Sequence, residues 1–405
     1  MGWGWGGGGA SAALVRPAKV LVLGAGSAGC VVARECEKLQ GVESVTLVDR
    51  KDHLDVSVGS PRALVDPEFG ARATPLLAEV FPAGSKVEVV QVRDIVAARA
   101  GGATVVRASD GAEAVLSGYD VVVVATGSKY GCRFVRNDAA SSGGCADRAG
   151  LMAQYRAFAA HVAWDGAGGV LIVGGGVSGV EMAGEVATDC PHVKVTLVHG
   201  GEHLTPFAPA LGRVCLASLQ KLGVDVVLGD RVDAEDALLD APRDYVTRGG
   251  RTIPGVTAVV DCTGIKGYNT EFLPAAALDA QGRVRTAPTL LVPALSEPGR
   301  PVFCCGDCAD RCEQKFIAAM ASAQSVAKGI REFCRTGRVT AKANVQPMGN
   351  FAILSIGRKE GAANLPFATG WAFNCLGRWA KAKDMMVPWM LKDQMGISFT
   401  RDLKP

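Results

Sequence analysis

The chain has 405 residues, 51 of them glycine, and a formal net charge of +3. Apolar residues make up 48% of the sequence and charged residues 20%, a balance that excludes an intrinsically disordered chain. The glycines follow no three-residue period, which excludes collagen. This length favours two or three domains, and so small a net charge argues against a nucleic-acid-binding protein.

We expect no membrane-spanning helix and no secretory signal. Two uncharged stretches, residues 20–33 and 166–180, are shorter than the roughly 20 residues that cross a bilayer. The first residues lack the basic and apolar regions of a secretory signal. The thirteen cysteines are odd in number and follow no repeating frame, so they suit reduced thiols in an intracellular protein better than a disulfide scaffold.

The first glycine-rich turn comes directly after an apolar run at residues 20–23. Its glycines have the spacing G-x-G-x-x-G, and a helical pattern and a second strand that ends on Asp49 follow. Gly24 permits a tight turn, Gly26 lets the backbone approach a pyrophosphate, and Gly29 allows close helix–strand packing. Asp49 can accept hydrogen bonds from a ribose. The pattern predicts a dinucleotide site; a glycine-rich turn in another α/β protein is the alternative.

The second turn, about 150 residues later, repeats this spacing with Gly174, Gly176 and Gly179. Its second strand ends on His199 and not on an acid. Without a carboxylate there, NADPH is not excluded, but no arginine stands beside His199 in the sequence, so the preference between NADH and NADPH is left open. Two such turns predict two dinucleotides, FAD and NAD(P)H; the alternative is a duplicated fold with one inactive site.

Three more apolar runs end in turns of small residues, which is typical of buried parallel strands whose carboxyl ends bind ligands. The turns contain Thr126 and Gly127, Thr263 and Gly264, and Gly306 and Asp307. Together with the two glycine loops, they predict an α/β fold with two Rossmann-like dinucleotide-binding domains and a small C-terminal domain.

The cysteines nearest the predicted FAD site do not form a metal-binding or redox motif. Cys305 and Cys308 are spaced C-x-x-C, and Cys312 follows Cys308 after three residues. A zinc site would need a second cysteine pair or histidine ligands, and none follows in the sequence. We therefore predict no metal and interpret these cysteines as small buried residues, which disfavours a disulfide reductase.

The order of motifs resembles one family of flavoproteins. The specific features are the Asp49-Arg50-Lys51-Asp52 run, the His199 strand end, the Gly306–Asp310 turn, and the segments 354–361 and 381–384. They resemble the ferroptosis-suppressor and apoptosis-inducing-factor-like, mitochondrion-associated flavoproteins, which are two-dinucleotide-domain reductases related to type II NADH dehydrogenases. We accordingly divide the chain into a tail (1–15), an FAD domain (16–145 and 275–345), an NAD(P)H domain (146–274) and a C-terminal domain (346–405).

The resemblance implies an FAD-containing NAD(P)H:quinone oxidoreductase that reduces a lipophilic, ubiquinone-like quinone. The residues that would hold FAD are Gly24, Gly26, Ser27, Ala28, Gly29, Arg62, Val92 and Asp307, of which Val92 lies in the most poorly matched segment. The resemblance places Glu181 near the stacked rings, and a carboxylate that complements a helix dipole in the first turn is the alternative. Lys381 would be the second active-site residue, or part of a solvated basic face.

The C-terminal residues also raise the question of a membrane surface. Trp371, Trp379 and Trp389 interleave with basic residues and methionines, as in segments that lie in a membrane interface or line a quinone tunnel. Gly2 could be myristoylated, but position six is glycine, so the acceptor pattern is incomplete. We expect peripheral contact with an intracellular membrane, of a mitochondrion or a lipid droplet.

Two other functions are compatible with the motifs. One is a flavoprotein reductase of a protein partner such as a ferredoxin. The other is a non-enzymatic signalling flavoprotein that binds nucleic acid, as some apoptosis-inducing relatives are described, although the near-neutral charge balance disfavours it.

Overall fold

The computed structural model describes residues 17–132, 134, 147–164, 166, 168–345, 347–365 and 377–397. The predicted tail, residues 1–15, lies outside the described residues, and so does the predicted domain boundary after residue 145.

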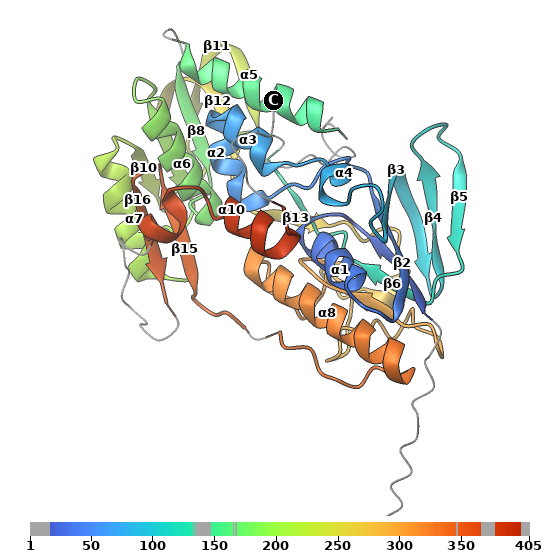
Figure 1. Cartoon of the computed structure of the whole chain (residues 1–405). Helices are drawn as coiled ribbons and strands as arrows, with labels where there is room; N and C mark the ends of the chain where they lie inside the picture. Colours follow the sequence, from blue (N-terminus) through green and yellow to red (C-terminus); the bar gives the residue numbers. More distant parts are fainter. Residues whose placement is uncertain are drawn as a thin grey trace, which may run out of the picture.

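A seven-stranded sheet forms the first body of the fold (Figure 1), in the order β14-β6-β1-β2-β3-β4-β5. The strands from β14 to β3 are parallel, and β4 and β5 continue the sheet antiparallel. The bounds are β1 (Ala18–Leu23), β2 (Val42–Asp49), β3 (Val87–Arg99), β4 (Gly102–Arg107), β5 (Glu113–Ser117), β6 (Val121–Val124) and β14 (Val302–Cys304). Because β14 comes from late in the chain, the strands of the second sheet lie between β6 and β14 in the sequence.

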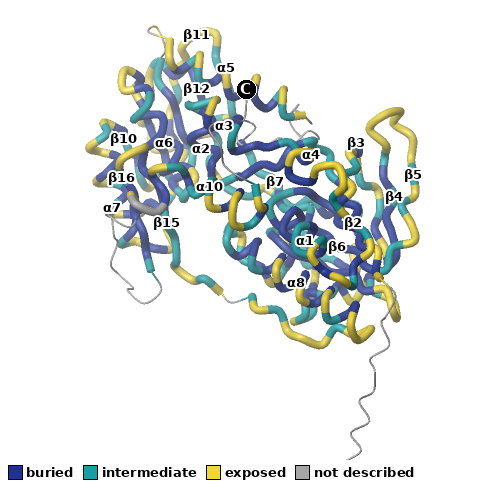
Figure 2. Tube along the Cα trace, viewed as in Figure 1, coloured by how far each residue is buried: buried dark blue, intermediate teal, exposed yellow. Residues whose placement is uncertain are grey.

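Both faces of this sheet are covered. The helices α1 (Ser27–Glu37) and α8 (Phe316–Thr336) pack side by side on one face (Figure 1). In β1, Val20 and Val22 point to these helices, whereas Leu21 and Leu23 belong to a separate core on the other face. Covering on both faces explains the unbroken apolar runs of the central strands, which Figure 2 shows as buried throughout.

A five-stranded sheet in the order β10-β9-β8-β12-β11 forms the second body. Its strands are parallel except β11, which pairs antiparallel with β12 at the edge. The bounds are β8 (Gly169–Val173), β9 (Val195–His199), β10 (Asp225–Leu228), β11 (Ala237–Val246) and β12 (Thr252–Asp261), with helices α6 (Val177–Asp189) and α7 (Pro209–Lys221).

Shorter elements join the two bodies. The strands β7 (Ser128–Tyr130) and β13 (Ile265–Tyr268) follow the first and the second sheet, respectively, and pair antiparallel with each other. The helix α5 (Arg148–Ala163) packs against α2 (Ser60–Val65) and α3 (Pro67–Ala73), and α4 (Leu77–Val80) is a single turn. The chain therefore crosses between the bodies at paired strands and packed helices.

The C-terminal part packs against the second body. The hairpin of β15 (Ala352–Ile356) and β16 (Glu360–Asn364) contacts α6 and α7. After it, two π-helical turns, Arg378–Ala382 and Met390–Gln394, flank the short α10 (Val387–Trp389). Figure 1 shows this segment in red beside α2, between the two bodies.

Both glycine loops have the same backbone geometry. Gly24 and Gly174 adopt left-handed φ values of 104° and 109°, where a side chain would be strained. A Cβ on Gly29 would lie 1.8 Å from the carbonyl oxygen of Gly24, and a Cβ on Gly179 would lie equally close to that of Gly174. In contrast, a Cβ on Gly26 would meet no protein atom within 4 Å. The third glycine of each loop thus serves the fold, and the space at Gly26 is left for a ligand.

We predict that Gly29→Ala lowers the stability of the protein, whereas Gly26→Ala lowers its content of FAD. Gly29→Ala forces the helix from the strand and lowers the free energy of unfolding by about 3 kcal/mol or more. Gly26→Ala changes the unfolding free energy of the FAD-free protein by no more than about 1 kcal/mol, the scale of a changed helix cap. It nevertheless reduces the FAD retained on purification, because the methyl group fills the space left for the pyrophosphate. Urea unfolding and the flavin absorbance of each variant measure the two effects, and equal destabilisation would contradict the prediction.

Candidate active site

A cavity of about 530 Å³ lies where the two bodies and the C-terminal segment meet. Many of its wall atoms belong to apolar side chains, including Phe316, Phe351, Ile353 and Met386. The predicted site residues that line it are Gly26, Ser27, Ala28, Gly127, Glu181, Gly264, Asp307 and Lys381. The structure thus brings residues that are up to 355 positions apart to one cavity.

The FAD-side wall is formed by helix N-termini and small residues. Helix α1 begins at Ser27 with no acidic residue in its first turn, so its free N–H groups and positive dipole end can face a phosphate. Asp49 supports the loop, because its carboxylate accepts hydrogen bonds from the backbone of Ala25 at 2.5 Å and of Lys51 at 2.9 Å. Asp307 accepts a hydrogen bond from Ser128 Oγ at 2.7 Å. The open space at Gly26 and the free N–H groups at the start of α1 fit a dinucleotide.

Arg62 and Val92, two of the predicted FAD residues, do not line this cavity. Val92 is a buried core residue of β3. The guanidinium of Arg62 donates two hydrogen bonds to Glu185, of 2.8 and 2.9 Å, and is 1% exposed. Its charge is thus matched inside the protein, and its role as an FAD ligand stays a prediction. Gly24, Gly29, Gly179 and Thr126 support the loops from behind the cavity lining; Thr126 Oγ1 donates to the Asn269 carbonyl at 2.6 Å.

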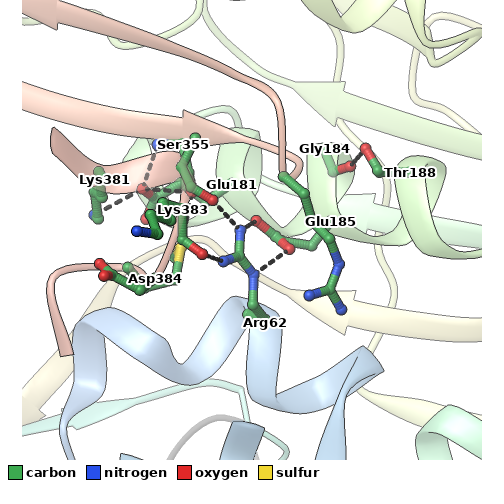
Figure 3. Close-up of polar contacts among 12 residues, drawn as sticks. Arg62, Glu181, Gly184, Glu185, Thr188, Ser355, Lys381, Lys383 and Asp384 are labelled. Carbon is green, nitrogen blue, oxygen red and sulfur yellow. Dashed lines mark hydrogen bonds and ion pairs between the residues drawn. The ribbon is translucent and has the colours of Figure 1, made fainter. Parts of the chain in front are cut away.

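Glu181 and Lys381 form an ion pair at the cavity wall, with 2.7 Å between Nζ and the carboxylate (Figure 3). Both side chains are buried, with exposed fractions of 6% or less. Ser355 of β15 donates to the same carboxylate from its backbone N–H at 3.0 Å and its hydroxyl at 3.3 Å. Since α6 begins at Val177 and has no acid in its first turn, the alternative of a dipole-complementing Glu181 is wrong. The burial of Lys381 likewise contradicts a solvated basic face at that position.

A second hollow, of about 710 Å³, lies along the other glycine loop and is lined by Gly174, Gly176, His199 and Thr263. His199 Nδ1 accepts a hydrogen bond from the Gly175 N–H at 3.1 Å. Burial lowers the pKa of His199, and the nearby Arg231 lowers it further, so the imidazole is neutral at neutral pH. Arg231 follows β10, which pairs with β9, the strand that ends on His199. The two residues are therefore close in space although they are far apart in the sequence.

The cysteines behind the cavity are buried, as the sequence indicated. The sulfur atoms of Cys304 and Cys308, which are not the C-x-x-C pair, lie 3.6 Å apart. Burial raises the pKa of Cys304, whereas a hydrogen bond from Cys304 lowers that of Cys308. Among the described residues, no three metal-ligating side chains come together.

The predicted membrane-contact segment is only partly described. Trp371 lies outside the described residues, and the side chain of Trp379 is not described either. Met385 and Met390 are buried, Met386 lines the cavity, and Trp389 is 38% exposed. No helix in the described part of the chain is long and apolar enough to cross a membrane. Contact with a membrane surface stays a prediction.

Comparison with known proteins agrees with the motif order. The family model described as pyridine nucleotide-disulphide oxidoreductase matches residues 16–326. Human ferroptosis suppressor protein 1 is 29% identical over 229 residues, which are 54% of this chain and 58% of that protein. Apoptosis-inducing factor homolog B of Dictyostelium discoideum is 24% identical over 403 residues, 91% and 95% of the two chains. Fe-regulated protein 8 of Mycosarcoma maydis is 36% identical, but the chain spans only 34% of its length. The predicted resemblance is confirmed.

Solved structures share the fold at low sequence identity. The sulfide:quinone oxidoreductase of Aquifex aeolicus superimposes with a TM-score of 0.67 at 15% identity, over 94% of this chain and 92% of that one. NDH2 of Plasmodium falciparum in complex with NADH gives 0.65 at 11% identity, over 95% and 100%. The predicted fold class is confirmed, and the family match supports FAD and NAD(P)H as cofactors.

We predict a strong energetic coupling between Glu181 and Lys381. Glu181→Gln or Lys381→Met alone leaves a buried charge without its partner and lowers the free energy of unfolding by about 3–5 kcal/mol. The double variant removes both charges and loses less than the sum of the single variants. Urea unfolding of the four proteins measures the coupling. Additive losses would show that the pair does not interact as the structure has it.

Proposed function

The chain belongs to the pyridine nucleotide-disulphide oxidoreductase family, and we propose that it is an FAD-dependent NAD(P)H:quinone oxidoreductase that reduces a lipophilic, ubiquinone-like quinone. The observation that carries the proposal is the largely apolar cavity with a buried ammonium–carboxylate pair in its wall. An apolar wall suits a quinone ring and its hydrophobic tail, and a proton donor suits its oxygen. The names of the human and Aquifex relatives support the same class of reaction.

The overall reaction is NAD(P)H + H⁺ + quinone → NAD(P)⁺ + hydroquinone. Bound FAD would supply the redox chemistry: it would accept a hydride from the nicotinamide and pass its equivalent, two electrons and one proton, to the quinone. The residues of the chain hold and orient the reactants. Gly26 and the N-terminus of α1 admit and neutralise the pyrophosphate, and the apolar side chains exclude water from the reacting groups.

Lys381 and Glu181 move the proton in this proposal. The Lys381 ammonium can donate a proton from Nζ to a quinone oxygen as that oxygen gains negative charge. Glu181 holds the ammonium in place, and its carboxylate can relay a proton from solvent to the amine that the transfer leaves, while Ser355 holds the carboxylate. One proton from solvent then restores the pair, which balances the H⁺ consumed.

A matched pair of lysine variants tests the proposal. We expect the purified protein to contain FAD and to accelerate NADH or NADPH oxidation when a short-chain ubiquinone is added. Lys381→Met lowers kcat/KM for the quinone by about 10²-fold, the range of general acid catalysis, with FAD retained. Lys392→Met, an exposed residue of the same segment, leaves it unchanged. A flavin-containing protein without quinone-dependent turnover would refute the proposal.

The competing hypothesis of a protein acceptor has its own expected result. A reductase of a ferredoxin-like partner would reduce a small iron–sulfur protein faster than a quinone, and its rate would fall with ionic strength. The apolar lining of the cavity favours the quinone.

A further inference from the structure

The pair of Arg62 and Glu185 repeats, one helical turn further along α6, the arrangement of Lys381 and Glu181. Glu185 is fully buried and receives both ends of the Arg62 fork, from Nε at 2.9 Å and Nη2 at 2.8 Å (Figure 3). Burial raises the pKa of Glu185, and the hydrogen bonds and charge of Arg62 offset part of that rise. A bidentate contact of this kind fixes the guanidinium in one orientation.

The same guanidinium holds the C-terminal segment by its backbone. Its Nη2 donates to the carbonyl oxygen of Ala382 at 2.7 Å, and its Nη1 donates to that of Lys383 at 2.8 Å. These are the two residues that directly follow Lys381. Arg62 therefore uses four hydrogen bonds to connect α2, α6 and the segment that carries the ammonium.

The backbone after these carbonyls is strained. Met385 and Met386 have φ values of 56° and 61°, the left-handed region that residues with side chains seldom adopt. Such a conformation costs about 1–3 kcal/mol per residue and persists only where the surrounding structure holds it. Two strained residues in succession show that this segment needs external contacts to keep its path. Arg62 supplies two such contacts immediately before them.

We propose that Arg62 and Glu185 are positioning residues, which keep Lys381 paired with Glu181 at the cavity wall by holding the carbonyls of Ala382 and Lys383. They line no part of the cavity and act through Lys381. The catalytic consequence rests on the proposed function, whereas the positioning itself does not.

Acetylation of lysines in the FAD-containing protein tests the positioning without any turnover. In the wild type, Lys381 reacts slowly with an acetylating ester because it is buried, and the exposed Lys392 reacts fast. We expect Arg62→Lys, which cannot form the fork, and Glu185→Gln, which leaves the fork without its counter-charge, each to raise the Lys381/Lys392 labelling ratio about tenfold through local opening. Peptide mass spectrometry measures the ratio.

Arg358 provides a matched control. It also connects the C-terminal part to α6 and the α2–α3 region, through ion pairs with Asp189 at 2.6 Å and Asp66 at 3.0 Å, but its side chain is 40% exposed. Arg358→Gln should leave the ratio at its wild-type value. Labelling of Lys381 that stays unchanged in both Arg62→Lys and Glu185→Gln would overturn the proposal. So would labelling that rises only together with alkylation of the buried Cys36, because the pair would then hold the whole fold.

A double-mutant cycle tests the catalytic consequence. If Arg62 and Glu185 act through Lys381, Glu185→Gln lowers kcat/KM for the quinone about tenfold in the wild type and less than about twofold in Lys381→Met. Equal losses in both backgrounds would overturn this role. If the protein does not reduce quinones, the labelling result still decides the positioning, so the two failures are distinguishable.

Discussion

The arrangement of the site depends on two buried carboxylates on one face of α6. Glu181 and Glu185 lie four residues apart, so their side chains point the same way, toward the space between the two bodies. A buried carboxylate must be paired, because the loss of hydration costs several kcal/mol. Each carboxylate receives a cation from a different part of the chain. One helix thereby fixes α2 on one side and the C-terminal segment on the other.

The two glycine loops satisfy a different constraint. In each, the third glycine lets a helix start almost in contact with the carbonyl of the first, so the free N–H groups of the helix end are brought to the edge of the sheet. Neither helix has an acid in its first turn, which would compete for these groups. The loops thus leave the charge of the helix ends for a ligand, whereas the Glu181 carboxylate of α6 lies at the cavity wall.

The C-terminal segment packs on the second body and contributes residues to the cavity wall. Its hairpin closes on α6 at Gly184, where a Cβ would come within 2.6 Å of the Gly357 backbone nitrogen. It then contributes Lys381 and Met386 to the cavity, one charged and one apolar. In the proposed reaction, this combination suits an acceptor that is itself apolar except for its carbonyl oxygens.

The fold was predictable from the sequence because its determinants are local. Glycine spacing, unbroken valine runs and small residues at strand ends each reflect the backbone needs of a parallel sheet, and they sufficed to locate the loops at Gly24 and Gly174. Glu181 and Lys381 were also found in the sequence, although only by resemblance. Their pairing was not visible, because 200 residues separate them and no local pattern encodes a contact across that distance.

Only the tertiary structure shows the contacts of Arg62, Glu185, Ser355 and Arg231. The sequence around Arg62 does not show whether its guanidinium binds a phosphate or a carboxylate. Only packing shows that Glu185 is buried within reach of Arg62 and that the fork also meets two backbone carbonyls. Burial and charge matching are properties of the assembled chain, so the sequence determines the nucleotide loops directly and the electrostatic partners only through the fold.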